Sequence, residues 1–67
     1  MSITKNRLKE FREKAGLSQE KLAFEADLMR SYVSDLERGQ RNPSIKALEK
    51  LANALGVKAA ELLADQQ

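Results

Sequence analysis

The sequence contains neither cysteine nor histidine. Their absence excludes disulfide bonds, zinc sites built from these side chains, thiol nucleophiles, and catalytic arrangements that pair serine or cysteine with histidine. Proline occurs once and glycine three times, so long stretches of the chain carry no helix-breaking residue. We therefore expect a protein that is not an enzyme and that uses no metal or cofactor.

Charge of one sign and long apolar runs are also scarce. Twelve Lys and Arg against ten Asp and Glu give a net charge of +2, which is too small to name a polyanionic partner. The basic residues are nevertheless concentrated in residues 1–14 and 30–46, whereas 15–29 and 47–67 are net acidic. No apolar run approaches the roughly 20 residues that span a bilayer, so we expect a soluble, cytoplasmic protein without a membrane partner.

The length and composition match one small globular domain over residues 1–67, with 42% apolar and 33% charged residues. A core of this size supplies only about 3–5 kcal/mol of stability. Because neither a disulfide nor a metal can add to it, we expect the chain to associate with a second copy of itself.

Apolar side chains recur at helical spacing, and no segment alternates as a β-strand does. We predict an all-α fold of five helices. Their expected ranges are about 4–15, 19–25, 30–38, a fourth that ends at Leu55 and is capped by Asn42 or Ser44, and a short fifth at 58–63. The apolar stripes predicted for the first and fourth helices consist of Leu8, Phe11 and Ala15, and of Ile45, Leu48, Ala52 and Leu55.

Only about four residues join the second and third predicted helices, so the two must cross at a steep angle. Such a crossing needs a small residue where the helices approach and a residue that tolerates positive φ in the turn, and Ala23 and Asp27 meet these needs. Apolar residues must face back across the joint, as Leu22, Leu28, Val33 and Leu36 do. Residues 18–38 therefore fit a helix-turn-helix.

Three segments resemble the XRE family of helix-turn-helix regulators, the Cro and phage-repressor type. They are LSQEKLA at 17–23, RSYVSDLERG at 30–39 and RNPS at 41–44. Within that family the RSYVS stretch is most similar to the controller proteins of restriction-modification systems. The resemblance covers almost the whole chain and implies a lambda-repressor-like fold. Asp27 departs from the family pattern, which commonly has glycine there.

The second helix of such a motif fits the major groove of DNA, and its N-terminal residues reach the base edges. The candidate base-contacting residues are Arg30, Ser31, Ser34 and Asp35. Arg30 can donate two hydrogen bonds to a guanine, although it could instead bind phosphate only. Asp35 could accept from cytosine or, alternatively, form a helical pair with Arg38.

Phosphate contacts are expected on both sides of this helix, from Ser18, Gln19, Tyr32, Arg38, Arg41, Asn42 and Lys46. Gln19 matches the backbone-clamping glutamine of the family; the alternative is that it only supports the helix cap. The resemblance favours DNA contact for Tyr32, whose ring could also pack on the core. The resemblance further implies that Glu37 forms a structural ion pair with Arg12.

One recognition helix contacts only about half of an operator, so we predict a homodimer on a palindromic site. The candidate dimer residues are Leu51, Ala54, Val57, Leu62 and Leu63, unless they only close the core. We predict a transcriptional regulator of double-stranded DNA, with no effector implied. An antitoxin-like protein-interaction module on the same fold is the alternative, and DNA binding would differ from it by its steep salt dependence.

Overall fold

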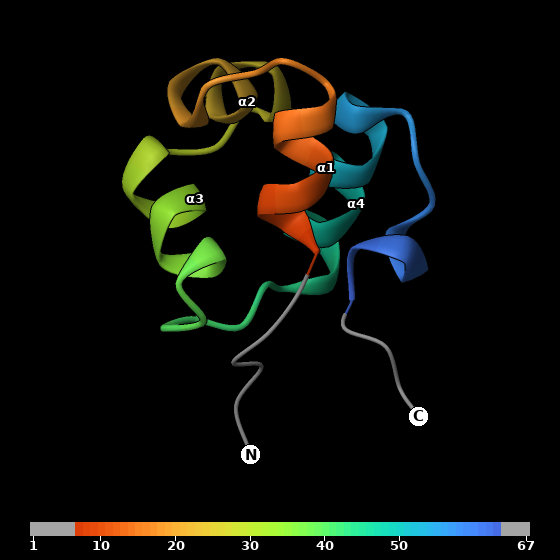
Figure 1. Ribbon diagram of the computed structural model, residues 1–67. Helices are drawn as coiled ribbons and strands as arrows, with labels where there is room; N and C mark the ends of the chain where they lie inside the picture. Colours follow the sequence, from red (N-terminus) through yellow and green to blue (C-terminus); the bar gives the residue numbers. More distant parts are fainter. Residues whose placement is uncertain (1–6, 64–67) are drawn as a thin grey trace.

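The computed structural model describes residues 7–63 and contains four α-helices and one 3-10 helix. In chain order these are α1 (Leu8–Lys14), α2 (Gln19–Ala26), α3 (Arg30–Glu37), α4 (Ile45–Leu55) and the 3-10 helix η1 (Ala59–Leu62). Figure 1 shows α2 across one end of the molecule, with α3 on one side and α4 and η1 on the other. The predicted all-α class is confirmed, but the fifth helix is a 3-10 turn and not an α-helix.

Serine side chains fix the starts of two helices. The Ser18 hydroxyl oxygen accepts a hydrogen bond from the Lys21 amide at 3.0 Å, at the start of α2. The Ser44 hydroxyl oxygen accepts from the Ala47 amide, also at 3.0 Å, at the start of α4. Each bond satisfies one of the amides that the first helical turn leaves without an intrahelical partner. Of the two predicted caps for the fourth helix, Ser44 is therefore the one used.

The two outer elements differ from their predicted ranges. α1 begins at Leu8, because Arg7 has a non-helical backbone (φ −103, ψ 16) and its amide donates to the Leu62 carbonyl at 2.8 Å. The predicted residues 4–6 lie outside the described part of the chain. η1 is a single 3-10 turn, in which the Glu61 amide donates to the Lys58 carbonyl at 2.9 Å. Four residues are too few to develop the hydrogen-bond pattern of an α-helix.

The core takes residues from every helix. Its buried members are Leu8, Leu22, Ala23, Ala26, Val33, Leu36, Leu51, Ala52 and Leu62. Within residues 7–63, no helix has the length and apolar character needed to cross a membrane.

Four predictions about apolar residues are corrected by the structure. Ala15, expected on the apolar stripe of the first helix, is exposed and directly follows α1. Ile45 is 78% exposed, because it is the first residue of α4 and lies beyond the edge of the core. Leu51 and Leu62 were expected at a dimer interface, but each is only 1% exposed. The apolar face of α4 is rotated toward Leu51, and η1 folds back so that Leu62 closes the core. Neither leucine is available to a second copy of the chain.

The joint between α2 and α3 has the predicted features. Asp27 adopts the left-handed conformation (φ 59, ψ 47), and among residues 7–63 it is the one non-glycine residue with positive φ. The Leu28 amide donates to the Ala23 carbonyl at 2.8 Å across this turn. Ala23 is buried at this joint, and because its side chain is small, the two helices can approach closely. The turn therefore holds α3 at a fixed angle to α2.

Replacing Asp27 by glycine is expected to stabilise the fold. The left-handed conformation costs an ordinary residue about 1–2 kcal/mol, and glycine avoids this cost but loses about 0.5–1 kcal/mol more entropy on folding. The side chain of Asp27 is 96% exposed and its one ion pair, with Lys50, is 3.9 Å long, so little else is lost. We expect Asp27→Gly to raise the free energy of unfolding by about 0.5 kcal/mol, measured by urea denaturation.

The reverse exchange provides the control. Gly56 is also left-handed (φ 71), and a Cβ atom there would meet no heavy atom within 4 Å. Gly56→Ala therefore tests backbone strain alone and is expected to destabilise by about 1 kcal/mol. If both variants shift the denaturation midpoint in the same direction, the argument from backbone conformation is wrong.

Candidate nucleic-acid interface

The outward face of α3 carries two of the four predicted base-contacting residues in exposed positions. Arg30 and Ser31 are exposed at the start of the helix, and Ser34 and Asp35 are half-buried one turn later. Val33, on the inward face, is fully buried. In residues 7–63 the structure gives Arg30 no carboxylate partner. Its guanidinium is therefore free to donate a pair of hydrogen bonds to a planar acceptor.

Asp35 lies between two arginines. The Arg38 Nη2 atom donates to Asp35 Oδ1 at 2.7 Å, which is the helical pair that the sequence offered as the alternative. The Arg41 Nε atom lies 3.8 Å from Asp35 Oδ2. Both predicted phosphate-contacting arginines are thus brought to the same carboxylate. The structure leaves this carboxylate only partly exposed, with 30% of the side chain accessible.

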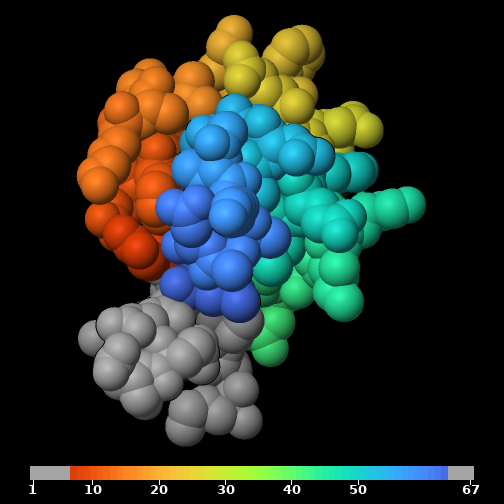
Figure 2. All heavy atoms as spheres, turned by 90° about the vertical axis from the view of Figure 1, so that its right-hand side faces the viewer, coloured from red at the N-terminus to blue at the C-terminus, as the bar shows by residue number. Residues whose placement is uncertain are grey.

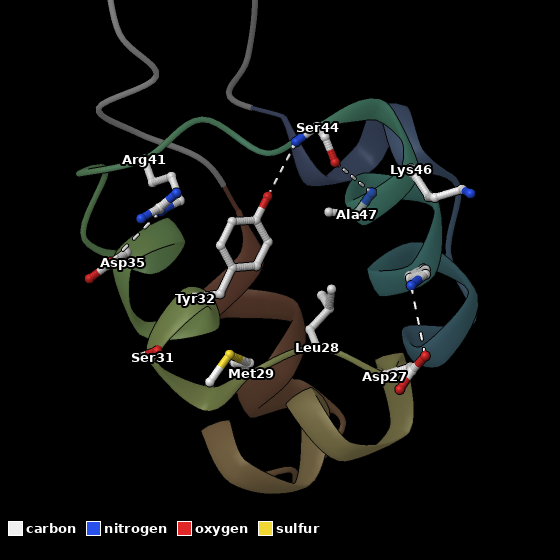
Figure 3. A pocket seen from close by; sticks show the side chains of 11 residues that line it. Asp27, Leu28, Met29, Ser31, Tyr32, Asp35, Arg41, Ser44, Lys46 and Ala47 are labelled. Carbon is white, nitrogen blue, oxygen red and sulfur yellow. Dashed lines mark hydrogen bonds and ion pairs between the residues drawn. The ribbon is translucent and has the colours of Figure 1, made fainter.

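Tyr32 connects α3 to the beginning of α4. Its hydroxyl oxygen accepts a hydrogen bond from the Ser44 amide at 3.3 Å. The Arg41 Cζ atom lies 5.5 Å from the centre of the tyrosine ring, which is a cation–π distance. Figure 3 shows the ring between α3 and α4, with Arg41 beside it. The half-buried ring therefore has a structural role in addition to any contact with DNA.

An open groove of about 490 Å³ runs between α3 and α4 along this tyrosine. Arg41 and Lys46, both exposed, line it together with Ser31 and Asp35. Asn42 is exposed in the loop between α3 and α4.

One cation of the groove, Lys50, was not predicted from the sequence; it lines the wall formed by α4. Lys46 and Lys50 are four residues apart on one helix and therefore lie on the same face. That spacing was the signal that could have identified Lys50.

Three helices meet at the Glu37 carboxylate. The Arg12 Nε atom donates to Glu37 Oε2 at 2.6 Å and Arg12 Nη2 donates to Oε1 at 3.2 Å. The Gln19 Nε2 atom donates to the same Oε1 at 3.0 Å. Arg12 also donates through Nη1 to the Leu17 carbonyl at 2.7 Å. The expected pair of Arg12 with Glu37 is thus present in the structure, and Gln19 is held by it.

This cluster is largely withdrawn from water, with side-chain exposures of 11% for Arg12 and 3% for Glu37. The hydrogen bond to Glu37 raises the pKa of Arg12, and partial burial opposes that rise. When a guanidinium and a carboxylate pair and satisfy each other's hydrogen bonds, their attraction offsets much of the free energy lost by removing both charges from water. Ser18 caps α2, and the bond from the neighbouring Gln19 to Glu37 ties the start of that helix to α3.

The remaining predicted residues form a different side of the molecule. Ala54, Val57 and Leu63 are half-buried and belong to the end of α4 and the segment around η1. Figure 2 shows α4 and η1 side by side on one face, and Figure 1 shows that this face is opposite α3. The candidate dimer residues are therefore separate from the candidate DNA-contacting residues.

Comparison with known proteins gives consistent matches. A family model described as helix-turn-helix matches residues 8–62. Control protein C.BamHI of Bacillus amyloliquefaciens is 58% identical over 50 residues, which cover 75% of this chain and 62% of that protein. The chain spans less than two thirds of the length of several curated relatives that it matches.

Two solved structures show the same fold. The restriction-modification controller protein C.AhdI from Aeromonas hydrophila superposes with a TM-score of 0.82 at 54% identity, over 85% of this chain and 86% of that one. The biofilm regulator SinR in complex with DNA superposes with a TM-score of 0.78 at 40% identity, over 81% and 87% of the two chains.

Removing the Glu37 carboxylate is expected to destabilise the fold strongly. Glu37→Ala would leave the Arg12 guanidinium mostly buried without its charged partner, and breaking a buried pair in this way costs about 3–5 kcal/mol. Because Arg12 also bonds to the Leu17 carbonyl, we expect a loss near the lower end, about 3 kcal/mol, measured by thermal and urea unfolding.

Glu25→Ala is the matched control. It removes an exposed carboxylate that lies 3.8 Å from Lys21, and we expect a change of less than about 0.5 kcal/mol. Equal melting temperatures for the Glu37→Ala variant and the parent would show that the pair does not hold the helices together.

Proposed function

The chain belongs to the helix-turn-helix family, and on this premise we propose that it is a sequence-specific DNA-binding transcriptional regulator. The observation that carries the proposal is the exposed face of α3. This face presents an exposed Arg30 and two small hydroxyl side chains, on a helix that the buried Val33 and Leu36 fix to the core. An eight-residue helix of this kind fits the major groove, and arginine is well suited to guanine.

The phosphates on either side of the groove would be contacted from two directions. At the start of α2, Ser18 and Gln19 present backbone amides and an amide side chain. On the other side, Arg41, Asn42 and Lys46 are exposed in the loop before α4 and in its first turn. Tyr32 and Arg38 complete the proposed backbone contacts. Such contacts set the register of α3, while Arg30, Ser31, Ser34 and Asp35 would distinguish the bases.

We further propose that the regulator acts as a homodimer on a palindromic operator, and that it is a restriction-modification controller. The similarity to C.BamHI and C.AhdI supports the controller role, because both are control proteins by name. Placing the dimer contact on the α4–η1 side leaves both copies of α3 free. Two such helices reach successive turns of DNA when their half-sites are roughly 34–36 Å apart.

Several broader expectations follow from the proposed role. We expect a regulator of this kind to work in the cytoplasm and to need neither a cofactor nor a small-molecule effector. The whole-protein role is that of a binding protein and not of an enzyme. Whether the operator site yields activation or repression depends on its distance from the promoter.

Arg30→Ala is expected to remove the preference for one guanine in each half-site. A bidentate arginine–guanine contact contributes roughly 1–3 kcal/mol of discrimination, which corresponds to about 5- to 150-fold between guanine and another base. The measurement is selection of bound sequences from random duplexes with the parent and with the variant, followed by titration of the selected site.

Lys46→Ala is the control for that experiment, because it removes a proposed phosphate contact. It should weaken binding to all sequences alike and lower the slope of log K against log salt by about 0.9. An unchanged motif with Arg30→Ala would remove Arg30 from base recognition. Failure of the parent to enrich any motif, with binding that does not respond to salt, would favour a protein-interaction module.

Ala54→Glu is expected to disrupt the proposed dimer. The change introduces a charge at the half-buried Ala54 near the end of α4, on the proposed dimer side, while glutamate remains a good helix former. Sedimentation at tens of micromolar should show a dimer for the parent and a monomer for the variant. Asn53→Glu places the same charge on the adjacent exposed position and should leave the dimer intact. A monomeric parent would contradict the proposed assembly.

A further inference from the structure

Building on the proposed DNA-binding function, we propose that Asp35 is a positioning residue that discriminates against DNA lacking the operator sequence. Its carboxylate engages Arg38 and Arg41 in the free protein, so that phosphates of an arbitrary duplex must compete for both guanidinium groups. The sequence suggested a base contact or a local helical pair for this residue. The structure indicates a third role, which depends on both arginines together.

The geometry assigns one carboxylate oxygen to each arginine. Oδ1 accepts from Arg38 Nη2 at 2.7 Å, and Oδ2 lies 3.8 Å from Arg41 Nε. Arg38 is the residue that caps the C-terminus of α3, three positions after Asp35, whereas Arg41 comes from the loop that follows. The carboxylate therefore draws together two cations that would otherwise extend independently into solvent.

Arg41 is also held from its other side. Its guanidinium carbon lies 5.5 Å from the centre of the Tyr32 ring, and the Tyr32 hydroxyl oxygen accepts from the Ser44 amide. Figure 3 shows the sequence of contacts from Asp35 through Arg41 and Tyr32 to the start of α4. Loss of the Asp35 carboxylate would leave Arg41 on the ring but remove the opposing charge. The cation would then be available to any phosphate near the groove.

Electrostatics determine whether Asp35 weakens or strengthens the binding of a given duplex. On an arbitrary duplex, an arginine that turns to a phosphate leaves Asp35 without its partner and close to a polyanion, which is unfavourable. At a matching site the same carboxylate can accept a hydrogen bond from the amino group of a cytosine in the major groove. The penalty is therefore offset only where the sequence supplies that donor. Specificity here arises by weakening the wrong complex.

A second acidic residue on the same helix shows that this role is distinct from a structural one. Glu37 is buried and binds side chains from two other helices, so its removal is expected to disturb the fold. Within residues 7–63 the ion pairs of Asp35 are with two exposed arginines, and exposed pairs contribute little to stability. An effect of Asp35 on DNA binding can therefore be measured in a folded protein.

The test compares Asp35→Asn with the parent on a random-sequence duplex and on the operator obtained by selection. Each freed arginine that gains a phosphate should steepen the log–log salt slope by about 0.9. At 0.1 M salt one such contact corresponds to about tenfold tighter binding to the random duplex. The ratio of operator to random-duplex affinity should fall by a similar factor. Thermal melting verifies the fold, and Asp35→Ala provides a second variant.

Glu25→Gln is the matched control, because it also removes one negative charge and one helical ion pair, in this case with Lys21 on α2. It should change random-duplex binding much less than Asp35→Asn does. A second control repeats Asp35→Asn in an Arg38→Gln/Arg41→Gln background. There the gain should disappear, because Asp35 acts through these two arginines; a purely general charge effect would persist.

The outcomes separate this inference from the function on which it depends. If the parent does not prefer its selected operator over the random duplex, the proposed function fails. If the parent discriminates but Asp35→Asn behaves as Glu25→Gln does, or binds random DNA more weakly, only the role of Asp35 is overturned. Weaker binding would show that the carboxylate orients the arginines toward DNA.

Discussion

The structure depends most on a single carboxylate, that of Glu37. It accepts hydrogen bonds from Arg12 on α1 and from Gln19 on α2, and it belongs to α3. Three helices are therefore fixed relative to one another by one polar contact at the edge of an apolar core. Apolar packing alone is not directional, whereas a bidentate guanidinium–carboxylate pair sets both distance and angle. The pair thereby fixes the orientation in which α3 presents its outer face.

The helix that presents the recognition face carries two acidic residues with opposite uses. Glu37 is withdrawn from water and works as a structural element, whereas Asp35 stays at the surface among arginines. They are two residues apart and so point in different directions from the helix. A protein that binds a polyanion can therefore retain both carboxylates, because one is shielded and the other is neutralised by nearby cations.

The sequence predicted the central part of the fold well, and the physical reason is that its determinants are local. The cap at Ser18, the small Ala23 and the turn residue Asp27 act within a few positions of themselves. The outer elements were predicted less well, because the start of α1 and the form of η1 depend on each other through a contact between distant segments. The sequence left open whether Leu51 and Leu62 form a dimer contact or close the core, since which apolar face is covered depends on where η1 folds.

In the candidate site, too, the features set by local spacing were predictable and the contacts between distant segments were not. Spacing placed Arg30, Ser31, Ser34 and Asp35 on one face, and the resemblance supplied the partner of Glu37. The contacts from Tyr32 to Ser44 and from Arg41 to the ring were not predictable, because they join helix positions to a loop whose path is set by the whole fold.

The hydrogen bond from the Arg7 amide to the Leu62 carbonyl joins residues more than 50 positions apart, while most other contacts in the helices are local. Closing so long a loop has a larger entropic cost than closing a helix–turn–helix. The α2–α3 unit therefore has the shorter route to its native geometry, and we expect the docking of η1 against α4 to follow it. In native-state hydrogen exchange, the Arg7 amide would report this docking step, since its protection depends on a carbonyl from the opposite end of the described chain.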